Sequence, residues 1–113
     1  MQGNLPKDLT PEVIEKLKQT AKAYPSGQIP SNFDPNNFVF HSNTGLVLML
    51  TLDSYGGSPR WNLSMSYARR APRDDEAHSV LTAFFGEAGN EARKVIKPEG
   101  APKNVLHYVV DAQ

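Results

Sequence analysis

Apolar and polar residues alternate without interruption over residues 60–67. The apolar members are Trp61, Leu63, Met65 and Tyr67. The polar members are Arg60, Asn62, Ser64 and Ser66. Because successive side chains of an extended chain point to opposite faces, this pattern predicts a strand with one buried face and one exposed face. Trp61 is the single tryptophan and is large and apolar, so we expect it to anchor the core.

Residues 11–24 carry the pattern of an amphipathic helix. Thr10 is a favourable N-cap residue, and Pro11 suits the first helical turn. Apolar residues recur at helical spacing, at Val13, Ile14, Leu17, Ala21 and Tyr24. The proline-rich residues 25–37 predict a long loop that tethers this helix to the sheet, with a binding loop as the alternative. Three apolar residues are expected to hold the loop against the core: Ile29, Phe33 and Phe38.

Four further segments are predicted to be strands, at residues 38–41, 46–53, 92–97 and 104–111. Residues 46–53 are apolar at most positions of both faces, so we expect this strand to be central and covered on both sides. Turns at residues 42–45 and 54–59 predict that the first three strands form an antiparallel meander. A second helix is predicted to begin at Asp74, within a run of three acidic residues that suits the positive end of the helix dipole, and to end near Gly86.

The predicted order is therefore α-β-β-β-α-β-β. Strands that follow one another without β-α-β alternation indicate an α+β fold with an antiparallel sheet of about five strands. We expect the helices to pack on one face of that sheet. A chain of 113 residues has the length of a single domain, so one domain is predicted over residues 1–113.

Composition narrows the choice of partner. Lysine plus arginine and aspartate plus glutamate number 12 each, and a net charge of zero argues against a general polyanion binder. The chain has no cysteine, which removes disulfides and thiolate chemistry and fits the cytoplasm. The N-terminus lacks the basic and apolar pattern of a signal segment, and the longest apolar run, residues 46–50, is too short to cross a membrane. We therefore expect a cytoplasmic protein with no membrane contact.

The sequence offers no catalytic, cofactor or metal motif. The three histidines, His41, His78 and His107, lack the spacing of metal ligands. We therefore predict no catalytic residues, no metal and no cofactor. A weaker alternative is a small hydrolase that uses Asp53 together with His41 or His107.

Arginines gather in a stretch without acidic residues, from Ser54 to Arg73. They are Arg60, Arg69, Arg70 and Arg73. Three interpretations remain open for the loop at residues 69–73. It pairs with the acidic residues 74–76 that follow, it binds phosphate or nucleic acid with help from Tyr67, or it contacts a protein partner.

The C-terminal half resembles a family of small, mostly uncharacterised proteins encoded by phages and prophages. The resemblance covers about residues 60–109. It rests on Trp61-Asn62-Leu63-Ser64-Met65-Ser66, Arg70-Ala71-Pro72, Phe84-Phe85-Gly86, Pro98, Asn104 and His107-Tyr108. The chain departs from the family at two places. The family often has a tryptophan just after the proline, where this chain has Arg73 and Asp74, and it tends to end in His-Leu-Trp, where this chain has His107-Tyr108-Val109. The family carries no established activity, so the resemblance implies a mobile-element protein that acts inside a bacterial cell.

These observations favour a small non-enzymatic protein that binds a host protein, with inhibition of a bacterial defence system as a specific form of that hypothesis. The expected contact residues are Arg60, Asn62, Ser64, Ser66, Arg69, Arg70 and Arg73. The alternative is a nucleic-acid-binding accessory protein that uses the loop at residues 69–73. Self-association through a sheet edge is a further alternative, because antiparallel sheets have edges that need covering.

Overall fold

The computed structural model describes residues 5–26, 28–55, 58–96 and 99–112. In chain order its elements are α1 (Pro11–Ala23), η1 (Pro35–Phe38), β1 (Val39–His41), β2 (Val47–Tyr55), β3 (Ser58–Ser66), α2 (Asp74–Phe85), η2 (Gly86–Glu91), β4 (Arg93–Lys94) and β5 (Val105–Asp111), where η marks a 3₁₀ helix. The central residues of the turn predicted at 54–59, Gly56 and Gly57, lie outside the described residues, as does Lys97 at the end of the strand predicted at 92–97.

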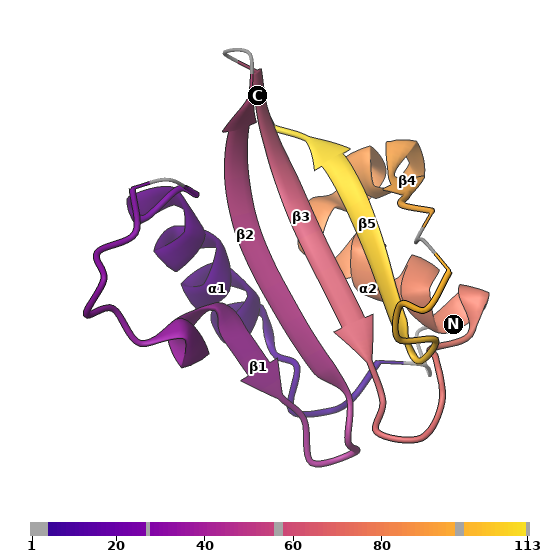
Figure 1. Ribbon diagram of the computed structural model, residues 1–113. Coiled ribbons are helices and arrows are strands. Elements are labelled where there is room, and N and C mark those ends of the chain that lie inside the picture. The colour runs from indigo at the N-terminus through magenta and orange to yellow at the C-terminus, as the bar shows by residue number, and fades with distance from the viewer. Residues whose placement is uncertain (1–4, 27, 56–57, 97–98, 113) are drawn as a thin grey trace.

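The strands form a five-stranded antiparallel sheet in the order β1-β2-β3-β5-β4. Helices α1 and α2 both lie against the same face of this sheet (Figure 1). The α+β fold with helices on one face is therefore confirmed. The meander β1-β2-β3 is also as predicted, and β5 returns along the free side of β3.

The core lies between the helices and the covered face of the sheet. The sheet contributes Leu48, Leu50, Leu63 and Met65, which have no exposed surface. The helices contribute a second set of buried residues: Leu17, Ala21, Ala77, Val80, Leu81 and Phe84. Trp61 is 7 % exposed and belongs to the same cluster, as its position in the alternating pattern predicted.

Helix α1 begins as the sequence predicts, and the loop after it is partly held to the core. The Thr10 hydroxyl accepts a hydrogen bond from the Val13 amide at 3.3 Å. In the loop, the Phe33 ring lies 4.4 Å from the Tyr24 ring and 5.2 Å from the Phe38 ring, between centroids. Ile29 is 39 % exposed, so the prediction that it contacts the core is wrong. The tilted contacts of Phe33 with Tyr24 and Phe38 connect the loop to the end of α1 and to η1.

The predicted coverage of β2 on both sides is also wrong. Strand β2 is internal, but β3 occupies the centre of the sheet, and Met49 on β2 is 41 % exposed. Both helices lie on one face, so the second apolar row of β2 has nothing above it among the described residues. The helices that the chain possesses are sufficient to cover one face of the sheet only.

The edge strands are β1, with three residues, and β4, with two. Short edge strands offer a second chain few backbone hydrogen bonds, which is a common way for sheets to avoid edge pairing. The two short edge strands themselves disfavour pairing, but residues 50–53 of β2 extend beyond β1 without a strand partner on that side, so self-association through a sheet edge stays a prediction. Among the described residues, no helix combines the length and apolar character needed to cross a membrane.

Candidate functional site

The polar residues of the alternating pattern lie on the face of the sheet that the helices leave uncovered. Each sits between a residue of β2 and a residue of β5. We call this surface the open face. Its rows across β2, β3 and β5 are Val47-Ser66-Val105, Met49-Ser64-His107, Thr51-Asn62-Val109 and Asp53-Arg60-Asp111.

The centre of the open face is apolar or uncharged, and its charges are at one end. Arg60 lies between Asp53 and Asp111 in the last row, so an acidic residue flanks this cation on each side. The other three rows contain valine, methionine, threonine, serine and asparagine, together with His107. Most of these side chains are half-buried by their neighbours, and Met49 is the most exposed large apolar residue among them.

A chain of hydrogen bonds crosses the open face from Asp53 through Asn62 to His107. The Asn62 side-chain nitrogen donates to an Asp53 carboxylate oxygen at 2.5 Å, and the Asn62 carbonyl oxygen lies 3.0 Å from His107 Nε2. Since the carboxylate can only accept, the amide nitrogen must face it, and Nε2 must carry the proton that reaches the amide oxygen. The chain therefore fixes the tautomer and orientation of His107, opposite Ser64.

The structure separates the two histidines that the sequence analysis considered together. His41 is on β1 and His107 is on β5, with β2 and β3 between them, which places them about 14 Å apart across the strands. The expectation that Asp53 acts with either histidine therefore reduces to His107. Within the described parts of the chain, no group of three or more histidine, aspartate or glutamate side chains is arranged to hold a metal ion.

Arg70 and Arg73 of the loop at residues 69–73 pair with acidic residues at the start of α2. Arg70 donates through Nη1 and Nη2 to the two carboxylate oxygens of Glu76, at 2.8 and 3.1 Å. Its guanidinium also lies 4.0 Å from the centre of the Tyr67 ring. Arg73 contacts Asp75 at 3.3 Å through Nε. Of the three interpretations of this loop, these contacts favour pairing with its own acidic residues.

Glu76 is the acidic residue at the centre of this loop, and the sequence placed it in a run of three acids without distinguishing it from Asp74 and Asp75. Its side chain is 9 % exposed and also accepts hydrogen bonds from the Arg73 amide at 2.7 Å and the Tyr67 hydroxyl at 3.2 Å. The Arg70 guanidinium and the Arg73 amide lower the pKa of Glu76 from 4.5 to about 2. Burial, with the Glu76 carboxylate nearby, raises the pKa of the Tyr67 hydroxyl. Glu76 is therefore ionised and engaged on both oxygens.

The motifs that carry the phage-protein resemblance have structural roles here. Arg70 binds Glu76, and Pro72 is buried. The Asn104 side chain donates to the Tyr67 backbone carbonyl at 2.7 Å and ties this loop to the start of β5. The expected contact residues Arg69, Arg70 and Arg73 are all exposed, and Arg70 and Arg73 also pair with acidic residues of α2.

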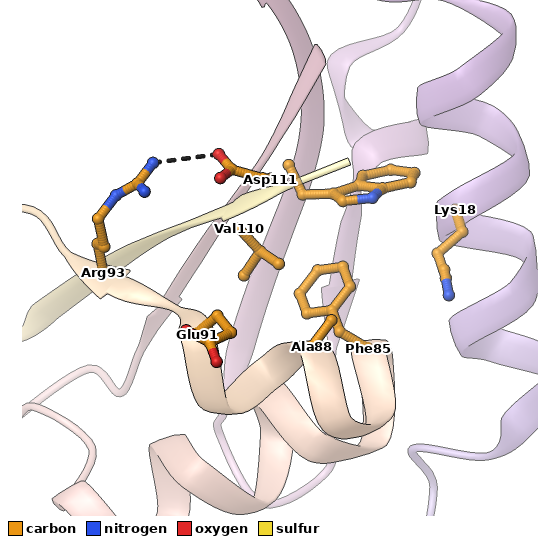
Figure 2. Close-up of a pocket in the computed structure, with 8 residues that line it drawn as sticks. Lys18, Phe85, Ala88, Glu91, Arg93, Val110 and Asp111 are labelled. Atoms are coloured by element: carbon orange, nitrogen blue, oxygen red, sulfur yellow. Dashed lines mark hydrogen bonds and ion pairs between the residues drawn. The ribbon is translucent and has the colours of Figure 1, made fainter. Parts of the chain in front are cut away.

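A cavity of about 540 Å³ is lined by residues of both helices, by Trp61 in the first half of β3 and by Val110 and Asp111 at the end of β5. Figure 2 shows Lys18 at one side of it and Arg93 at the other, with Phe85 and Val110 between them. Arg93 forms an ion pair with Asp111 at 3.2 Å. The lining comes from α1, α2, η2 and the strands β3, β4 and β5. These segments are far apart in the sequence, so no local sequence pattern indicates this cavity.

Comparison of the chain with protein-family models, with curated proteins and with solved structures finds no match.

Proposed function

We propose that the protein is a non-enzymatic binding protein whose open face contacts a protein partner. The observation that carries this proposal is the exposed central part of the sheet, where Met49 lies beside Ser64. Their row across β2, β3 and β5 contains no acidic, lysine or arginine side chain. The centres of protein interfaces are depleted in charged residues and enriched in methionine and aromatic residues. A surface of this composition is suited to a partner that also presents uncharged groups.

A protein of the bacterial host is the partner that we propose, with a component of a defence system as the specific case. The small size of the chain and its resemblance to phage-encoded proteins support this choice. Nucleic acid is less favoured as a partner. Arg70 and Arg73 already have acidic partners, and Arg60 lies between Asp53 and Asp111, so few arginines remain for phosphate.

The Met49→Asp variant tests this proposal. We expect tagged wild-type protein to retain a discrete partner from bacterial lysate after nuclease treatment and a high-salt wash, and we expect this variant to lose it. A charge at the centre of the open face would have to be desolvated against an uncharged partner. Because Met49 is 41 % exposed, the substitution should change the free energy of unfolding by only about 1 kcal/mol.

The matched control is Gln28→Asp, which adds the same charge at an exposed position outside the sheet. It should retain the partner as the wild type does. Equal retention by the Met49→Asp variant would exclude the open face as the contact surface. A parallel pulldown without nuclease that recovers nucleic acid at low salt and loses it at high salt would instead support the nucleic-acid alternative, because phosphate contacts weaken steeply with salt.

Hydrolysis is the second candidate, and the Asp53-Asn62-His107 chain is the observation that favours it. His107 is held in one orientation by Asn62 and lies opposite Ser64 in the neighbouring strand. A histidine and a serine in this arrangement have the chemistry of a general base and its nucleophile. This candidate predicts saturable hydrolysis of a p-nitrophenyl ester that falls roughly 100-fold in the His107→Ala variant. The His41→Ala variant is the control, since β2 and β3 lie between His41 and His107. Activity that survives alanine at Asp53 and His107 would eliminate this candidate.

A further inference from the structure

The cavity on the helical side of the sheet has aromatic walls. The Trp61 and Phe85 rings lie 5.9 Å apart between centroids, with an angle of 39° between their planes. Ala88 and Val110 add apolar surface to the lining. Ligand sites in proteins are mostly apolar cavities of about 300–1,000 Å³ with a few polar groups, and this cavity falls within that range. Its walls suit a flat ring.

Trp61 offers the cavity a hydrogen-bond donor. Its side chain is 7 % exposed, and its indole N–H has no acceptor among the described residues. Among the described residues, every buried side-chain nitrogen or oxygen atom has a hydrogen-bond partner. The indole N–H has none, so it must retain some solvent-accessible surface. Because Trp61 lines the cavity, a ligand there would lie close to this indole.

The charged residues around the cavity select the charge of the ligand. Arg93 is paired with Asp111, whereas the partners of Lys18 in the described structure are the Phe84 carbonyl oxygen, at 2.8 Å, and the Phe85 ring, at 5.7 Å. An ammonium group has three N–H donors, and the carbonyl uses one of them. Lys18 therefore keeps two donors beside the Phe85 ring and forms no ion pair with an acidic side chain of the described residues.

Glu91 also lines the cavity, and Figure 2 shows it on the side of Arg93, away from Lys18. Its carboxylate disfavours a second negative group on the ligand at that side. We infer that the cavity binds a small aromatic monocarboxylate, with the ring against Trp61 and Phe85 and the carboxylate at Lys18. Asp111 belongs both to this lining and to the last row of the open face, but Met49 and Ser64 at the centre of that face do not line the cavity. The test of the cavity therefore does not depend on the proposed protein partner.

The probe for this inference is 1-naphthoate, added to ¹⁵N-labelled protein. A single tryptophan gives a single indole N–H cross-peak, so NMR reports directly on Trp61. We expect this cross-peak to shift saturably with 1-naphthoate. The Lys18→Gln variant can still donate to the Phe84 carbonyl but lacks the charge, and it should bind roughly tenfold more weakly.

The control variant is Lys22→Gln, which removes the same charge from the exposed last turn of α1 and should bind 1-naphthoate as the wild type does. The uncharged analogue 1-naphthamide should bind as weakly to the wild type as 1-naphthoate binds to the Lys18→Gln variant. Thermal melting of both variants checks that the fold is intact. The inference is overturned if the indole cross-peak does not shift saturably, if the two lysine variants bind 1-naphthoate equally, or if the amide binds as tightly as the carboxylate.

Discussion

The Met65→Ala variant is expected to lose about 3 kcal/mol of unfolding free energy, whereas the Met49→Ala variant should lose less than about 1 kcal/mol. Both methionines lie in internal strands of the same sheet, so the two substitutions remove the same atoms from the same type of backbone. Met65 has no exposed surface and packs among Leu48 and Leu106 in the neighbouring strands. Its removal leaves a cavity, while Met49 faces outward and is 41 % exposed.

Urea denaturation of the two variants measures this difference. Equal losses would show that Met49 is buried in solution and would contradict an open face in the isolated chain. In that case a melting temperature that rises with protein concentration would identify a second copy of the chain as the cover, because association stabilises the folded state by mass action. The comparison therefore also tests self-association, the alternative that the short edge strands disfavour.

Glu76 should make the protein sensitive to acid over a defined pH range. Its folded-state pKa, about 2, lies below its usual value of 4.5, so the stabilisation is complete above pH 4.5 and is lost as the pH falls toward 2. A pKa depression of this size corresponds to about 3 kcal/mol. Arg70 is 46 % exposed and the pair is partly screened by water, so we expect about 2 kcal/mol.

The Glu76→Gln variant isolates this contribution, because glutamine has the same shape and does not titrate. It should be about 2 kcal/mol less stable than the wild type at neutral pH, and the difference should vanish near the folded-state pKa. The control is Asp74→Asn, an exposed acid in the same first turn, which should follow the wild-type pH dependence. A constant difference between the wild type and the Glu76→Gln variant across this range would show that the ionised form is not selectively stabilised.

The same geometry bears on Arg70, which the sequence analysis names as an expected contact residue. An Arg70→Glu substitution is the obvious test of that expectation. In the structure this substitution would place a second carboxylate against Glu76 and remove two hydrogen bonds. It would therefore report on folding, and the open-face residues Asn62, Ser64 and Ser66 are better tests of binding.

Local pattern was sufficient to predict most of the fold. The period-two alternation of residues 60–67 identified β3 and its buried tryptophan, and the Thr10-Pro11 signal located the start of α1 to the residue. Alternation also determined which side chains of β3 lie on the open face. These features depend on residues that are close together in the sequence, so local sequence patterns are sufficient to predict them.

What the sequence determined by itself is therefore the two α-helices, the order of the strands along the chain, the fold class and the two faces of β3. It did not predict the 3₁₀ helices η1 and η2, and the strand predicted at residues 92–97 is only Arg93–Lys94. The tertiary structure alone decided that β2 is covered on one side, that Asn62 links Asp53 to His107, and that Glu76 binds Arg70. It also decided that Lys18, Trp61 and Phe85 line one cavity. The physical reason is that these contacts join separate elements, and their distances depend on strand order and helix packing, which no local periodicity encodes.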